Sequence, residues 1–145
     1  MNRVIAASVL LCAGVMVDAN ADCSNKQEEK LQKLLSGEHV CAVRLGDVWR
    51  ERHDASGKLV DIKKGLNDPV DPEKEVGTWS VTDDGTADAA VTYTYNAFGP
   101  AVSFKYKVYK IKSTTGTHDF CDVNTPANIV ANATIQAVAC PPPGP

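Results

Sequence analysis

Short runs of alternating apolar and polar residues, separated by turn-forming residues, constrain the fold of this chain more than any other feature. The alternation is clearest from Val102 to Val108, where every second side chain is apolar. A period of two is that of a β-strand with one buried face. Turn residues such as Asp83-Asp84-Gly85 separate the runs, and no amphipathic helix lies between them. The pattern therefore predicts a mainly β fold rather than a parallel sheet covered by helices.

We expect an antiparallel meander of seven or eight strands that forms a barrel or near-closed barrel, with a two-sheet β-sandwich as the alternative. The alanine-rich segment 128–140 also suits a helix, but its alternation favours a strand. A β-bulge is expected at Val108-Tyr109, because Tyr109 and Ile111 fall on the face that lysines occupy before them. The expected strands are 40–45, 47–53, 58–63, 76–82, 90–96, 102–112, 117–123 and 128–140.

One short N-terminal α-helix is expected before the first strand. Ser24 and Gln27 have the spacing of a capping box, in which each side chain bonds the other's backbone N–H. Leu31 and the pair Leu34-Leu35 then fall on one helical face, and Gly37 follows as a stop. We expect a helix of about three turns that packs its leucine stripe on its own domain.

Residues 1–21 have the pattern of a signal peptide. A positively charged start precedes an apolar run from Val4 to Val17, and small residues stand at Ala19 and Ala21. The run is short for a membrane span, so we expect no stable membrane anchor. Cleavage after Ala21 would leave one barrel-like domain over 22–140 and an unstructured proline-rich tail over 141–145. We expect the protein to be secreted or periplasmic.

The cysteine count agrees with export. Cys12 lies in the leader, and the remaining four residues are an even number, which in a small exported domain indicates two disulfides. No pair has the two-residue spacing of redox or zinc motifs. We expect Cys41–Cys121, which would tie the first strand to a late one, and Cys23–Cys140, which would join the two termini.

Composition and motifs argue against several function classes. Among 145 residues, 15 Lys and Arg stand against 18 Asp and Glu, so the net charge of −3 gives no basic excess for binding nucleic acid. No nucleophile elbow, zinc-protease motif or phosphate-binding glycine loop is present. The histidines are dispersed, and we expect His53 and His118, each followed by Asp, to be solvated at strand ends. We therefore predict no enzyme, no catalytic residue, no metal and no cofactor.

Charged residues gather in two places. Segment 66–88 holds seven carboxylates and one lysine, but it lacks the spacing of a calcium-binding loop, so we favour solvated turns. A later strand carries four lysines without an acid, at Lys105, Lys107, Lys110 and Lys112. They form either a patch for an acidic partner or a guard along an open sheet edge. We favour edge protection.

Aromatic residues offer a second candidate binding surface. An eight-stranded barrel has room for one small ligand, and aromatic side chains on strand faces could line such a cavity. We favour the alternative that they fill the core. Phe98 differs, because a large apolar side chain at a loop tip is a candidate contact. The candidates on strands are Trp49, Trp79, Tyr93 and Tyr95, together with Phe104 and Tyr106.

Three sequence pieces carry a resemblance. They are Leu35-Ser36-Gly37 leading into the first strand, Gly77-Thr78-Trp79, and the tyrosine-rich strands with YTY and YKVY. Together they resemble small secreted proteins of Gram-negative bacteria with a calycin-type barrel, the lipocalin and avidin-like group. A lipocalin has its Gly-x-Trp on the first strand, whereas here it lies near mid-chain, so the position of that motif does not carry over. The resemblance implies a barrel and a binding habit rather than an activity.

We therefore expect a monomeric, secreted or periplasmic binding protein without enzymatic activity. Its partner would be a protein, for example a hydrolase that it inhibits, held by Phe98, by the loop 65–75 or by the lysine strand. The alternative is a carrier of a small apolar ligand between the two tryptophans and the Tyr93/Tyr95 face. A carrier predicts an internal cavity open at one end, whereas a surface binder predicts a filled interior and an exposed patch.

Overall fold

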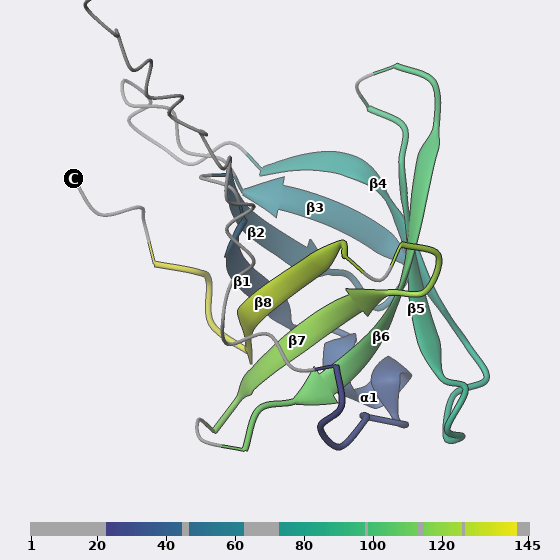
Figure 1. Ribbon diagram of the computed structural model, residues 1–145. Coiled ribbons are helices and arrows are strands. Elements are labelled where there is room, and N and C mark those ends of the chain that lie inside the picture. The colour runs from purple at the N-terminus through teal and green to yellow at the C-terminus, as the bar shows by residue number, and fades with distance from the viewer. Residues whose placement is uncertain are drawn as a thin grey trace, which may run out of the picture.

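The computed structural model describes residues 23–44, 47–62, 73–97, 99–112, 115–125 and 127–141, and within them it shows one short helix and eight strands. Each strand pairs antiparallel with the next in sequence, and the last pairs with the first, so the sheet closes into a barrel (Figure 1). In chain order the elements are α1 (Leu31–Leu35), β1 (His39–Arg44), β2 (Asp47–His53), β3 (Lys58–Ile62), β4 (Glu73–Thr82), β5 (Ala90–Tyr95), β6 (Val102–Lys110), β7 (Thr117–Asp122) and β8 (Ile129–Gln136).

Closure depends on the pairing of β1 with β8, in which Val40 lies opposite Ile135 and Cys41 opposite Thr134. The predicted meander barrel is confirmed, and the sandwich alternative is wrong. The prediction of a strand rather than a helix near the C-terminus is also confirmed, since β8 covers Ile129–Gln136. An eight-stranded antiparallel barrel is consistent with a calycin-like fold.

The bulge expected in β6 is absent. The pairing of β6 with β7 continues without a shift through Val108 and Tyr109, and the barrel's register shifts lie instead between β3 and β4 and between β7 and β8. Tyr109 stays on the outer face because the N-terminal segment covers that face, with Gln27 forming a β-bridge to Tyr109. Tyr109 is therefore accommodated on the outer face by the N-terminal segment that packs on it, without a bulge in β6.

The helix is shorter than expected, and its predicted capping box is not used. Residues 26–28 lie beside β6, where the Glu28 N–H donates to the Val108 carbonyl over 2.8 Å. The cap comes from a distant turn instead, because the Gln32 N–H donates to the Asp84 carboxylate over 3.0 Å. That bond satisfies one of the donors that a helix start leaves without an intrahelical partner.

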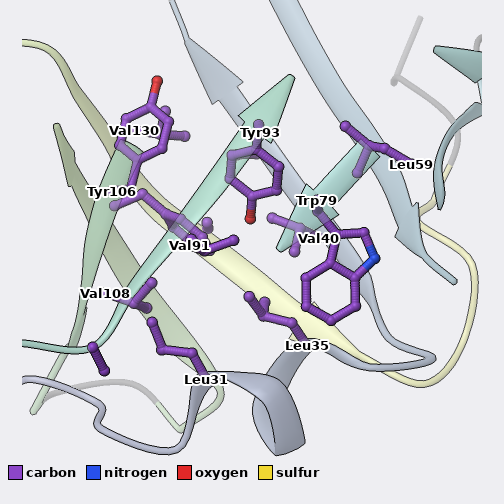
Figure 2. Packing of buried hydrophobic residues seen from close by; sticks show 14 of the residues in the cluster. Leu31, Leu35, Val40, Leu59, Trp79, Val91, Tyr93, Tyr106, Val108 and Val130 are labelled. Atoms are coloured by element: carbon purple, nitrogen blue, oxygen red, sulfur yellow. The ribbon is translucent and has the colours of Figure 1, made fainter. Parts of the chain in front are cut away.

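α1 closes one end of the barrel. Leu31 and Leu35 are fully buried and point from α1 into the barrel, toward Val108 and Trp79 (Figure 2). The turn between β4 and β5 lies at the same end, where the Gly85 N–H donates to the Glu29 carbonyl. Burial of a complete leucine side chain contributes roughly 2 kcal/mol. Five residues of helix are thus held by tertiary packing rather than by intrinsic propensity.

The disulfides are Cys23–Cys121 and Cys41–Cys140, so both predicted pairings are wrong. Cys41 lies on β1 and Cys121 on β7, and β8 stands between these strands. Strands two apart are separated by about 9.6 Å, beyond the reach of a disulfide. Each bridge instead fastens a chain end to the barrel, the N-terminal segment to β7 and the C-terminal segment to β1. The prediction of two disulfides among these four cysteines is confirmed.

Gly77 marks a close approach of β4 to β5. A Cβ atom at this position would collide with the backbone carbonyl of Thr94 on the neighbouring strand. The glycine of the Gly-Thr-Trp motif therefore has a local steric role, which is to let the two strands pair at this point.

We expect Leu35→Ala to lower the free energy of unfolding by about 3 kcal/mol, because it removes a fully buried side chain from the closed end. Urea denaturation followed by circular dichroism measures this change. Leu34→Ala is the matched control, since Leu34 is only partly buried on the same helix, and it should cost clearly less. Equal losses for the two variants would contradict the role of α1 as a plug.

Candidate functional site

The structure divides the predicted aromatic residues between the two ends of the barrel. Trp79 and Tyr93 lie opposite each other on β4 and β5, and both are buried in the core toward α1. Trp49 and Tyr95 are partly buried against the same core. Since β5 runs away from α1, Tyr95 lies nearer the opposite end than Tyr93 does. Core filling is confirmed for Trp79, Tyr93 and Tyr106, and the partly buried members of the set are Trp49, Tyr95 and Phe104.

Aromatic rings fill the barrel toward α1. The centroids of Tyr93 and Tyr106 are 6.0 Å apart, and those of Tyr106 and Phe120 are 6.3 Å apart. All three side chains are almost completely buried, and Tyr93 and Tyr106 lie above the leucines of α1 (Figure 2). This half of the interior is a packed core.

The interior toward the other end combines aromatic and acidic groups. Glu51 on β2 lies opposite both Val40 of the core and Asp61 on β3, so the two carboxylates share the inner face. The Tyr95 hydroxyl donates to the Glu51 carboxylate over 2.9 Å. Burial, together with the charge of Glu51, raises the pKa of Tyr95. The wall next to Trp49 and Tyr95 is therefore polar as well as aromatic.

His53 is completely buried, so the prediction of a solvated histidine is wrong. Its Nε2 lies 2.9 Å from the Tyr93 hydroxyl, and its ring meets Trp79 edge-on at 5.2 Å. The connection from α1 to β1 covers it, since the Gly37 N–H donates to the His53 carbonyl. Burial lowers the pKa of His53 to about 4.

His118 is also buried rather than solvated, with its Nε2 3.4 Å from the Glu28 carboxylate. All four cysteines of the described chain are in disulfides. Among the described residues, no three metal-ligating side chains come together. No helix in that part of the chain has the length and apolar character of a membrane span.

The burial of His53 makes stability depend on pH. The unfolded chain takes up a proton on this histidine below pH 6.5, whereas the folded protein resists until about pH 4. The stability that neutral, buried His53 contributes is therefore complete above pH 6.5. As the pH falls toward 4, the free energy of unfolding decreases by about 3 kcal/mol through this group.

We expect His53→Gln to remove this part of the pH dependence, because glutamine does not titrate. The measurement is urea denaturation of wild type and variant between pH 7 and pH 4, with His118→Gln as the matched control. If wild type and His53→Gln lost stability in parallel over this range, His53 would not be the titrating group.

The lysines of β6 do not protect an edge, so the interpretation that we favoured from the sequence is wrong. β6 pairs with β5 from Val102 to Tyr106 and with β7 from Tyr106 to Lys110. A closed barrel has no open edge on this strand. Lys105 and Lys107 alternate with inward-facing Phe104 and Tyr106, so they lie on the outer wall of the barrel, and we call them the wall lysines.

The N-terminal segment brings a further lysine to the end of β6, where Lys110 shares the face of Tyr106 and Val108 rather than that of the wall lysines. Lys26 lies beside the end of β6, where its carbonyl accepts a hydrogen bond from the Lys110 N–H over 2.9 Å. Lys26, Lys110 and Lys112, which we call the rim lysines, line a hollow of about 260 Å³ together with Ile111 and Thr115. Sequence reasoning missed Lys26, because this residue is far from β6 along the chain.

A second hollow of about 310 Å³ adjoins the wall lysines. Lys107 and Tyr109 of β6 form one side, the Cys23–Cys121 disulfide and Val123 contribute an apolar part, and the carboxylate of Asp122 also lines the hollow. Lys107 donates to the Ala87 carbonyl over 3.1 Å and pairs with Asp88 at 3.4 Å. Within the described chain, Lys105 and the three rim lysines have no ion-pair partner.

Of the acidic segment, Asp83, Asp84 and Asp88 are exposed in the connection between β4 and β5, as expected, whereas Glu73 and Glu75 lie on β4 rather than in a turn. Asp84 caps α1, and Glu75 pairs with Lys58 on β3 at 2.9 Å. Several predicted features lie outside the described residues. They are Phe98, residues 63–72 with most of the loop 65–75, the leader 1–21, and the last part of the tail, 142–145.

No protein-family model, curated protein or solved structure matches this chain.

Proposed function

We propose that this protein is an exported interaction protein without enzymatic activity, which binds an acidic protein partner through its wall and rim lysines. The observation that carries the proposal is the position of these lysines on and beside β6, which lies between β5 and β7 in a closed barrel. Like charges close together on a surface repel one another. Since they guard no edge here, we infer that they serve a partner that supplies carboxylates.

The surroundings of the wall lysines support this function. The chain as a whole is acidic, at −3, so a basic face on it is a local departure that selects partners by charge. The adjoining hollow adds an apolar part, where Val123 is 44% exposed. A charged rim around apolar surface suits a protein segment that combines acidic and apolar side chains.

Export is part of the proposal. Two disulfides are consistent with an oxidising compartment, either the periplasm or the extracellular space. The leader pattern of residues 1–21 supports the same destination. The side chains of His53 and His118 are themselves buried in the barrel structure rather than exposed in an open cleft, which favours binding over catalysis.

We expect the double variant Lys105→Glu/Lys107→Glu to weaken binding of a fluorescein-labelled, glutamate-rich peptide by about tenfold or more at low salt. Two attractive charges become repulsive, and the effect should shrink as salt is added. Fluorescence anisotropy measures the affinity.

The matched control for this variant is Lys58→Glu/Lys74→Glu, which makes the same change in net charge on β3 and β4. This control should leave the affinity within about twofold of the wild type, because these side chains lie away from β6. Equal losses for both double variants would indicate a nonspecific charge effect and overturn the assignment of the site.

A carrier of a small apolar ligand is the second candidate. Trp49, Tyr95 and Phe104 are partly buried against the core, and the register places Tyr95 and Phe104 opposite residues of the inner face. The carboxylates of Glu51 and Asp61 on the same inner face argue against a purely apolar ligand. Absence of peptide binding, together with a change in Trp49 emission on adding an apolar dye, would favour the carrier.

Export also has a direct test. Mass spectrometry of the protein released by the producing cell should give a chain that begins at Asp22 with all four remaining cysteines oxidised. A retained leader, or free thiols in the released protein, would contradict this part of the proposal.

A further inference from the structure

The rim lysines face one another across a short antiparallel pairing. Gln27 forms a bridge with Tyr109, which sets Lys26 directly opposite Lys110. Side chains opposite each other on neighbouring strands are about 5 Å apart at Cβ, and like charges in such a pair are destabilising. Lys112 follows Lys110 by two residues and lines the same hollow. Three positive charges therefore surround one small hollow, and none of the described residues that line it carries a carboxylate.

The backbone holds this arrangement in place. The Glu28 N–H donates to the Val108 carbonyl over 2.8 Å, and the Gln27 side chain donates to the Ala89 carbonyl over 3.2 Å. Upstream, the disulfide from Cys23 to Cys121 ties the segment to β7. Lys26 therefore cannot move away from Lys110 simply by shifting its backbone.

We infer that this hollow is a subsite for a compact oxyanion, a phosphate, sulfate or paired carboxylate group, and that the Cys23–Cys121 disulfide assembles it. An anion between the lysines converts their mutual repulsion into attraction, so its binding should be stronger than to a single exposed lysine. The inference rests on the proposed function in one respect, because it takes this oxyanion to be part of an acidic protein partner.

The dependence on the disulfide follows from the way Lys26 is placed. Lys110 and Lys112 belong to β6 and its end, whereas Lys26 belongs to a segment that is outside the barrel wall. Without the bond to Cys121, this segment keeps a few backbone hydrogen bonds next to solvent, and it should leave β6 for part of the time. The other disulfide, Cys41–Cys140, joins β1 to the C-terminal segment and does not touch this hollow.

The test is a titration of the oxidised protein with inorganic phosphate, followed by NMR at the backbone amides of Lys26 and Lys110. We expect saturable shifts at these amides, and a loss of affinity of about two- to fivefold for Lys26→Ala and for Lys110→Ala. Lys30→Ala is the matched control, because Lys30 lines a different hollow beside α1, and it should bind phosphate as the wild type does. Unchanged affinity in both rim variants would overturn the inference.

The role of the disulfide is tested with Cys23→Ser/Cys121→Ser, which should lose affinity as Lys26→Ala does, and with Cys41→Ser/Cys140→Ser, which should not. Circular dichroism establishes that each variant is folded. Wild-type affinity in folded Cys23→Ser/Cys121→Ser would overturn the disulfide dependence, and if that variant does not fold, equal affinity of Lys26→Ala and wild type still overturns the subsite.

The glutamate-rich peptide separates this inference from the proposed function. Peptide binding that depends on the wall lysines but not on the rim lysines would overturn the subsite and restrict the proposed function to the wall lysines. Phosphate binding that depends on Lys26, without any peptide binding, would support the subsite for the free ion and overturn the acidic protein partner.

Discussion

The closure of β1 onto β8 is the interaction on which the rest of the structure depends. It consists of three residue pairs, in which Val40 and Ile135 contribute to the inside while Cys41 and Thr134 face outward. Once this seam is formed, every strand has two neighbours. The inner faces of eight strands then enclose a core that one turn of helix is able to seal at its end. Closure also decides how charged side chains on the wall are interpreted, because a strand without an open edge does not need lysines for protection.

Outside the barrel, the two chain ends become part of the surface through the disulfides. The N-terminal segment continues the sheet beside β6 beyond the start of β5, so Tyr109 gains a cover and Lys26 gains two basic neighbours. Sequence positions more than 80 residues apart thereby form one electrostatic feature. The same segment leads directly into α1, whose start is capped by Asp84 from the β4–β5 turn. Fastening the N-terminal segment and sealing the barrel are thus consequences of one stretch of chain.

The fold was accessible from the sequence because the alternation that signals a strand is local: the expected runs match eight real strands to within a few residues at most ends. The buried pairing of Trp79 with Tyr93 follows from the same pattern. The errors concern contacts between distant segments. Which cysteines pair depends on β8 lying between β1 and β7, and no local pattern carries that order. The buried His53 is bonded through its backbone to the α1–β1 connection, and no capping box starts a helix at Ser24 because residues 26–28 pair with β6 instead. For the candidate site, the lysines of β6 were found, but their partner Lys26 and the absence of an edge required the three-dimensional arrangement.

The two disulfides overlap along the chain, since one spans Cys23 to Cys121 and the other Cys41 to Cys140. A mechanical force applied at the two termini therefore has two short covalent routes between Cys23 and Cys140. One passes through the first bridge and then along β8, and the other passes along α1 and part of β1 to the second bridge. Strands β2 to β6 lie on neither route. As long as the sulfur bonds last, tension on the termini cannot extend those strands, and the wall that carries Lys105 and Lys107 would keep its shape while the protein is pulled.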